Sequence, residues 1–293
     1  MTGAVVERSP PFCCTPTRAD LPAPVGVRPA HSRSQMSAST GRYTNDGMVR
    51  TRLVAAASIV GWCVVVPSAQ RLDPARRAIE SYRAAIQRAQ KTPSGGQLEV
   101  AFNAIGPLRE ALVISRDGGN SALEALSEPE FNQLRRELVG LVVNREEVVF
   151  VEPDVEFFQA LAARGDAADR AFFSALSATL PDSIWAVYVE QQTDYSGCTR
   201  FGSGTLVATY LTWSAFRQQY PKRYAEASGT HLDDVKRELT DSTCACGDRA
   251  SVEKELTEFL RRAKVSELRT EIAARLAAVR SDRAEFRFAC TSG

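Results

Sequence analysis

The chain has 293 residues, of which 44% are hydrophobic and 24% are charged, so it is long enough and apolar enough to bury a sizeable core. Lysine and arginine (36) nearly balance aspartate and glutamate (35), and this balance excludes the strong basic field typical of proteins that bind nucleic acid or an anionic membrane. Only two histidines are present, His31 and His231, which excludes a metal centre built on three histidines of one chain.

The first segment, residues 1–47, is rich in proline, serine, threonine and arginine and poor in bulky apolar residues. Such a composition buries too little apolar surface to offset the entropy that is lost when a chain becomes ordered. We therefore expect 1–47 to be a disordered extension. Because a signal sequence normally begins a chain, we also expect translation to start at Met36 or Met48, which would leave most of this extension unmade.

Residues 48–69 have the order of a secretory signal peptide. Met48 is followed by two arginines, an apolar run at 53–66 and the small residues "PSA". The run is shorter than the roughly 20 apolar residues that a membrane-spanning helix needs. We therefore expect cleavage after Ala69, with an uncleaved anchor as the alternative. The mature protein is then periplasmic or secreted and has no stable membrane span.

Beyond the signal, apolar residues recur at helical spacing, and the segment ends carry capping signals. Asp73 and Pro74 predict the start of the first helix. Gly106 and Pro107 predict a kink or a break in the second, and Ser127 predicts the cap of the third. The helices expected in this half cover residues 72–91, 97–115, 127–143, 154–165, 166–180 and 181–189.

Three stretches interrupt the helical pattern. Residues 146–154 are β-branched enough for a short strand or for the approach to the next helix, whereas 190–205 is polar, glycine-rich and without a clear period. Residues 284–290 alternate like a strand that is too short to found a sheet. Further helices are expected at 206–220, 221–228, 231–239, 251–264 and 266–280. The sequence thus predicts an all-α fold, with residues 70–293 forming a single helical domain.

Two stretches of the second half can be superposed at an offset of 43 residues, which pairs Trp213 with Leu256. Each stretch predicts a helix, a short break and a second helix. With Tyr220 before a proline and Tyr224 before an alanine, residues 206–281 resemble the tetratricopeptide-type helical hairpins of bacterial envelope proteins. This resemblance implies an irregular array of antiparallel helical hairpins that binds another protein, and it identifies no active site.

Four cysteines remain after the signal is removed, and an even number in an exported chain is typical of disulfides. Two bridges are expected, either Cys198 with Cys244 and Cys246 with Cys290, or the crossed partners. Each bridge would contribute about 4 kcal/mol at most. A bridge between Cys244 and Cys246 would close a small, strained ring typical of a redox pair. Zinc needs wider spacing than the single residue between these two cysteines, so we expect no metal.

The strongest candidates for a binding function lie where aromatic residues gather, between residues 185 and 224. Tyr195 and Arg200 are expected to form an exposed recognition loop, because tyrosine and arginine are typical interface anchors. Trp213 and Tyr220 are candidates for lining a groove, with burial in the core as the other interpretation. Neither a phosphate-binding loop nor a calcium loop is present in the sequence, so no cofactor is expected.

Glu190 and Asp194 are the best placed pair of carboxylates for hydrolysis of a glycan. The structural interpretation of this pair is a solvated helix end. His231 would lie in the first turn of a helix, where a solvated histidine is more common than a general base. The sequence therefore favours a binding or scaffold module of the cell envelope whose partner is another envelope protein. The alternative is an extracytoplasmic hydrolase of glycan or cell wall that uses carboxylates of 190–205.

Removal of the signal peptide can be tested on the protein recovered from the envelope fraction of its host. We expect the intact mass of a chain that begins at Gln70, because cleavage follows the small residue Ala69. Detection of any peptide from residues 1–35 would contradict the expected start of translation.

Overall fold

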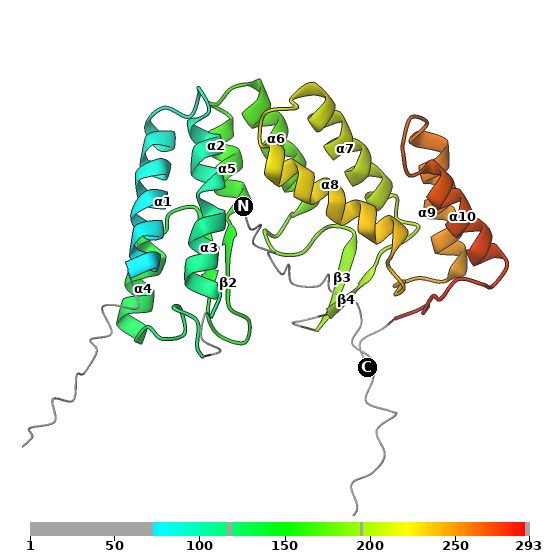
Figure 1. The fold of residues 1–293 in the computed structure, drawn as a ribbon, viewed down its shortest axis with the longest axis horizontal. Helices are drawn as coiled ribbons and strands as arrows, with labels where there is room; N and C mark the ends of the chain where they lie inside the picture. Colours follow the sequence, from blue (N-terminus) through cyan, green and yellow to red (C-terminus); the bar gives the residue numbers. More distant parts are fainter. Residues whose placement is uncertain (1–72, 116–118, 194–195, 291–293) are drawn as a thin grey trace, which may run out of the picture. The chain divides into compact units, whose positions relative to one another are not determined.

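The computed structural model describes residues 73–115, 119–193 and 196–290 (Figure 1). The expectations for 1–47 and 48–69 lie outside these residues, as do Asp194 and Tyr195. No helix within the described residues is long and apolar enough to cross a membrane. The helices are α1 (Asp73–Lys91), α2 (Gln97–Asn103), α3 (Ile105–Val113), α4 (Glu128–Glu137), α5 (Val155–Ala162), α6 (Ala167–Thr179), α7 (Thr205–Gln219), α8 (Ala225–Thr240), α9 (Arg249–Arg262) and α10 (Arg269–Arg280), and the strands are β1 (Leu141–Asn144), β2 (Phe150–Pro153), β3 (Val189–Thr193) and β4 (Ser196–Thr199).

In the first half, α1 packs against both α2 and α3, and α3 packs against β2 (Figure 1). The expected break near Gly106 and Pro107 is present, because α2 ends at Asn103 and α3 begins at Ile105. Pro107 lies in the first turn of α3, where its missing N–H removes no helical hydrogen bond. The break turns the apolar faces of both short helices onto α1, with Leu98 and Leu108 fully buried.

The third expected helix starts where its cap predicts and ends earlier. Ser127 and Glu130 form a capping box, in which the Ser127 backbone N–H donates to the Glu130 carboxylate at 2.8 Å. The expectation that the helix continues to residue 143 is wrong, because α4 ends at Glu137. Gly140 follows with a φ of +80°, and a Cβ at this position would lie 2.4 Å from the Phe157 ring. This glycine lets the chain reverse into β1, which pairs antiparallel with β2.

The expectation of a helix at 181–189 is also wrong. The Asp182 carboxylate accepts backbone N–H groups from Ile184 at 3.1 Å and Trp185 at 2.8 Å, a local turn that competes with helix formation. Ser183 has a φ of +67°, which ends any helical path. The irregular stretch at 190–205 then forms the antiparallel hairpin β3–β4. The fold is therefore helix-rich with two small two-stranded sheets within the described residues, and it is not all-α.

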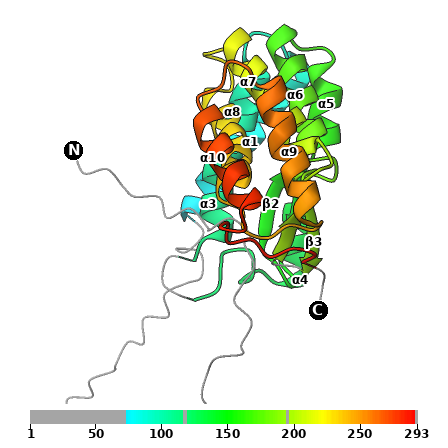
Figure 2. The same cartoon turned by 90° about the vertical axis from the view of Figure 1, so that its right-hand side faces the viewer.

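The second half contains two helical hairpins, α7–α8 and α9–α10, and α7 also contacts α9 (Figure 2). The two helices expected at 221–228 and 231–239 are the single helix α8. Trp213 and Leu256, which the repeat pairs with each other, are both fully buried, in α7 and α9 respectively. The two hairpins thus bury corresponding apolar positions against their neighbours.

A buried carboxylate joins α9 to the start of α7. Glu255 is 1% exposed and accepts backbone N–H groups from Gly202 and Gly204 at 2.8 Å each and from Val207 at 3.1 Å. The first N–H groups of a helix have no partner within the helix, so they bind an anion well. Both glycines have a φ of +81°, a conformation that glycine adopts readily and that lets both N–H groups point at the same carboxylate. The glycine-rich loop therefore binds an internal anion.

Arg223, in the turn between α7 and α8, joins this half to the first. Its guanidinium donates to Glu99 at 2.6 Å, to Asp166 at 2.7 Å and to Asp169 at 2.8 Å. The Asp169 side chain is fully buried, and it also accepts the Tyr224 hydroxyl at 2.7 Å. We name these five residues the arginine cluster. Asp169 requires Arg223, because an uncompensated charge at a buried position is costly.

Replacement of Arg223 by methionine is expected to lower the free energy of unfolding by about 3 kcal/mol, since it leaves Asp169 buried and unpaired. The measurement is urea denaturation at pH 7. The matched control is Arg76→Met in the exposed pair of Arg76 with Glu80 on α1, for which we expect less than about 0.5 kcal/mol. Equal losses for the two variants would contradict a central role for the arginine cluster.

Candidate functional site

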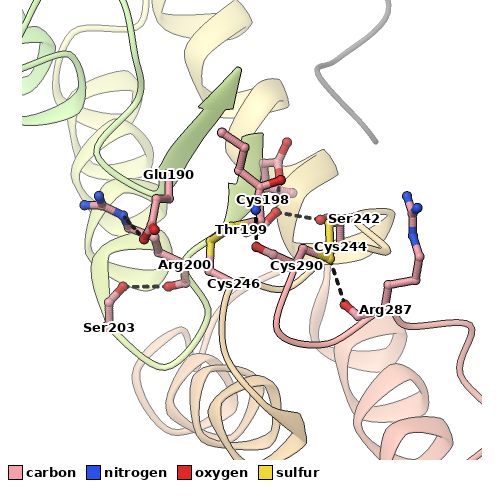
Figure 3. The surroundings of a disulfide bond; sticks show 12 residues. Glu190, Cys198, Thr199, Arg200, Ser203, Ser242, Cys244, Cys246, Arg287 and Cys290 are labelled. Atoms are coloured by element: carbon pink, nitrogen blue, oxygen red, sulfur yellow. Dashed lines mark hydrogen bonds and ion pairs between the residues drawn. A yellow bond between two sulfur atoms is a disulfide. The ribbon is translucent and has the colours of Figure 1, made fainter. Parts of the chain in front are cut away.

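Most of the candidate residues from the sequence gather around one junction of three chain segments (Figure 3). Strand β4, residues 243–247 and residues 284–290 run side by side and are joined by the parallel bridges Thr199–Ala245 and Cys244–Arg287. Thr199 of β4 exchanges two backbone hydrogen bonds with 243–247, at 2.9 and 3.0 Å, and Arg287 exchanges two more with it, at 2.8 and 2.9 Å. We name residues 284–290 the strap and the three segments together the disulfide junction. The sequence predicted an alternation of apolar and polar residues in the strap. Backbone hydrogen bonds to residues 243–247 give the strap its ordered conformation.

Two disulfides cross-link this junction. Cys198 of β4 pairs with Cys246, and Cys244 pairs with Cys290 of the strap. These are the crossed partners of the two alternatives expected for a pair of structural bridges, and Cys244 does not pair with Cys246. The bridges span sequence separations of 48 and 46 residues, so the chain-entropy model assigns each a stabilisation of about 4 kcal/mol at most. Each bridge joins one buried cysteine, Cys198 or Cys244, to one that is partly exposed.

A polar network lies beneath the junction. The Thr199 hydroxyl bonds to the Glu238 carboxylate and to the Ser242 hydroxyl, at 2.6 Å each. Burial raises the pKa of Glu238 above its ordinary value, although hydrogen bonds from Thr199 and Ser242 act in the opposite direction. Arg275 of α10 donates to the Ser242 carbonyl, and burial lowers its pKa to about 10. These groups fix α8 and α10 against the back of β4.

Glu190 and Arg200 lie on the outer surface of the β3–β4 hairpin (Figure 3). Their side chains are 55% and 47% exposed and form an ion pair at 3.5 Å. The Arg200 backbone N–H donates to the Tyr188 carbonyl at 2.8 Å, which fixes where this side chain leaves the hairpin. Asp194 and Tyr195 lie outside the described residues, so the roles expected for them remain predictions. Within the described residues, Arg200 is the charged group that the structure sets against Glu190.

The other two binding candidates lie on α7 and at its end. Trp213 is fully buried and donates its indole N–H to the Thr179 hydroxyl at 2.9 Å. This position agrees with the core interpretation, and Trp213 is therefore not part of the surface. Tyr220 follows the last residue of α7, is partly buried and packs against Phe216 with ring centroids 5.4 Å apart.

His231 does not lie in the first turn of a helix, because α8 begins six residues earlier at Ala225. Its ring stacks on Trp213 with centroids 4.8 Å apart. Burial, and then the nearby charge of Arg109, lower the pKa of His231 to about 4. Arg109 is itself held by the Val151 carbonyl at 2.9 Å and by Glu152 of β2. The imidazole is therefore uncharged at neutral pH and packs as an aromatic ring.

Sequence reasoning missed Glu238, Arg275 and Glu255, which hold the chain segments of the candidate site in place through hydrogen bonds to Thr199, Ser242 and Gly202. Each is a charged residue on a helix, and a charged residue on a helix normally marks its solvated face. Their partners lie 33 to 53 residues away in sequence, so no local spacing indicates them.

No protein family, curated protein or solved structure matches this chain. Within the described residues, no group of three or more histidine, cysteine, aspartate and glutamate side chains is placed to hold a metal ion. The interpretation of the site therefore depends on the geometry of the disulfide junction and the hairpin.

The pKa of His231 predicts a pH dependence of stability. The ordinary pKa is 6.5 and the folded value is about 4, so the unfolded chain binds the extra proton more strongly between these values. Stability contributed by the neutral ring is thus present above pH 6.5 and is lost as the pH falls toward 4. Between pH 7 and pH 5 we expect the wild type to lose roughly 2 kcal/mol more than His231→Phe, which keeps the stack on Trp213.

The measurement is urea denaturation of both proteins at the two pH values, with the difference taken within each protein. Carboxylates that titrate in the same range are common to both proteins and cancel. An equal loss of stability in the two proteins would show that His231 titrates normally.

Proposed function

We propose that this protein is an exported binding module of the cell envelope, and that the β3–β4 hairpin presents its recognition surface. The observation that carries the proposal is the disulfide junction, in which two bridges tie the base of an exposed, charged hairpin to the rest of the fold. Disulfides persist in oxidising compartments outside the cytoplasm, which is where the expected signal peptide would direct the chain.

The junction suits recognition because it makes the hairpin rigid. A two-stranded hairpin alone is marginally stable in water, and a mobile one would lose entropy on binding. Here the Cys198–Cys246 bridge and the hydrogen bonds of Thr199 fix β4 from behind. Glu190 and Arg200 then point outward from a fixed backbone, with their charges ordered before a partner arrives.

The partner that fits this surface is another envelope protein with a complementary ion pair. Glu190 and Arg200 carry one charge of each sign, so the surface selects orientation through charge complementarity and does not attract polyanions. The helical hairpins α7–α8 and α9–α10 would serve as the support, in the manner that the resemblance to tetratricopeptide-type proteins implies.

The alternative of a glycan hydrolase would need a second carboxylate facing Glu190 across a cleft. In the described residues Glu190 faces Arg200, which favours recognition over general acid–base chemistry.

The proposal is tested by reversing a charge on the hairpin. We expect Arg200→Glu to reduce cross-linking of the protein to its partner at least tenfold in intact envelopes, because two carboxylates would then repel the partner's acidic group. The measurement is lysine-directed cross-linking followed by mass spectrometry. The control Arg76→Glu disrupts a more exposed ion pair on α1 and should leave the same cross-links in place.

Both variants should keep the thermal midpoint of the wild type, because surface ion pairs contribute at most about 1 kcal/mol. Unchanged cross-links in Arg200→Glu would remove the hairpin from the binding surface. Free thiols in the protein taken from its host, detected as no gain of about four mass units on reduction, would remove the oxidising compartment on which the proposal depends.

A further inference from the structure

The strap lies along residues 243–247, pairs with them through one parallel β-bridge at Arg287, and bends at Ala289, which has a φ of +50°. Arg287 pairs with residues 243 and 245, and two further backbone N–H groups donate to this segment, from Ala289 to Gly247 at 2.9 Å and from Cys290 to Ala245 at 3.1 Å. Backbone hydrogen bonds of this kind are independent of side chains, so the edge at 243–247 can accept any extended segment of chain. The strap also contacts the β3–β4 hairpin, because the Gln192 side chain of β3 donates to the Cys290 carbonyl.

Two aromatic side chains of the strap provide its side-chain contacts. Phe286 packs edge-to-face against Phe201 with centroids 5.7 Å apart, and the Arg275 guanidinium lies 4.7 Å from its ring centre. Phe288 stacks on Phe286 at 5.7 Å and has Arg249 at 5.6 Å. Cation–π contacts of this kind stabilise a complex without requiring the whole ring to be buried. The groove thus consists of the edge 243–247 and the side chains of Phe201, Arg249 and Arg275.

The strap does not provide an acceptor for every hydrogen-bond donor in this groove. The Nε and Nη1 atoms of Arg275 are buried and have no hydrogen-bond partner among the described residues. Buried donors without an acceptor are costly. A strand that supplied a carbonyl or carboxylate oxygen beside Arg275 would therefore bind this groove better than the strap does.

We propose that the groove is a binding site for an extended, aromatic-bearing peptide segment of another protein, that the strap fills it in the oxidised chain, and that a dithiol reductant vacates it by opening the Cys244–Cys290 bridge. The two bridges differ in what their opening releases. The Cys198–Cys246 bridge joins β4 to 243–247, and β4 stays paired with β3 and bonded through Thr199 without it. Among the described residues, the Cys244–Cys290 bridge is the one covalent cross-link between the strap and residues 243–247.

The opening step is thiol–disulfide exchange. A thiolate of the reductant attacks the Cys290 sulfur, which is the partly exposed end of the bridge, whereas Cys244 is 2% exposed. The S–S bond breaks, and Cys244 leaves as a thiolate that takes a proton from water. The second thiol of the reductant then attacks the mixed disulfide on Cys290 and frees it as a thiolate, which is protonated in turn. Two electrons pass to the protein, and the dithiol is oxidised to its own disulfide.

The binding test uses the full chain and a fluorescent peptide of residues 283–290 in which Cys290→Ser removes the thiol. The strap of the same chain competes at a high effective concentration, so the test variant combines Cys244→Ser and Cys290→Ser with Phe286→Ala, which weakens the strap. By fluorescence anisotropy we expect this variant to bind the peptide at least tenfold more tightly than the oxidised wild type.

Two controls make the result specific. The variant Cys198→Ser with Cys246→Ser, which removes the other bridge, should bind no better than the wild type. A peptide that carries Phe286→Ala should lose at least tenfold in affinity for the test variant. Equal binding of the peptide by the test variant and the wild type, or equal binding of the two peptides, would overturn the proposal.

A second measurement needs no variant. The wild type is treated with increasing dithiothreitol, and hydrogen exchange of the strap is followed together with alkylation of Cys290. We expect the strap amides to lose protection in step with alkylation, while the amides of β4 remain protected. A strap that stays protected when Cys290 is alkylated, or a loss of protection in β4 at the same time, would show that the bridge does not control the groove. Neither outcome affects the test on the hairpin surface.

Discussion

The single guanidinium of Arg223 fixes the turn between α7 and α8 against the first half of the fold. It bonds three carboxylates that come from α2 and from the first turn of α6 and its cap, 54 to 124 residues away in sequence. The next residue, Tyr224, has a φ of +48°, a conformation that costs a bulky side chain of order 1 kcal/mol. Its ring stacks on Phe172 with centroids 3.9 Å apart and its hydroxyl reaches Asp169, so local strain is offset by burial.

The position of α8 follows from this constraint, and α8 carries the polar residues that reach the disulfide junction. Glu238, fourteen residues after Tyr224, meets Thr199 of β4. The arginine cluster is thus connected through one helix to the back of the hairpin. A hairpin that is only two strands wide gains its rigidity from the helices that pack against it, not from its own hydrogen bonds.

Sequence analysis predicted the elements that depend on local signals. The cap at Ser127 and the break near Pro107 were predicted correctly, because each depends on residues close together in the chain. The even number of cysteines predicted the two bridges from composition alone. A short strand at 146–154 was one of two alternatives, and β2 confirms it. The other three strands were missed or assigned to other structure, because strands of four or five residues acquire order from pairing. The bridge partners stayed open for the same reason. Which cysteine meets which is decided by the order of β4, residues 243–247 and the strap across the junction.

The carboxylate of Glu255 has a consequence for the order in which the chain acquires its structure. Three backbone N–H groups at the start of α7 have their acceptor 48 to 53 residues downstream. As the polypeptide emerges in the direction of synthesis, the glycine turn before α7 is complete only once α9 has followed it. Until then, solvent or a chaperone must satisfy these donors. The helices of the second half are therefore expected to mature together rather than one after another.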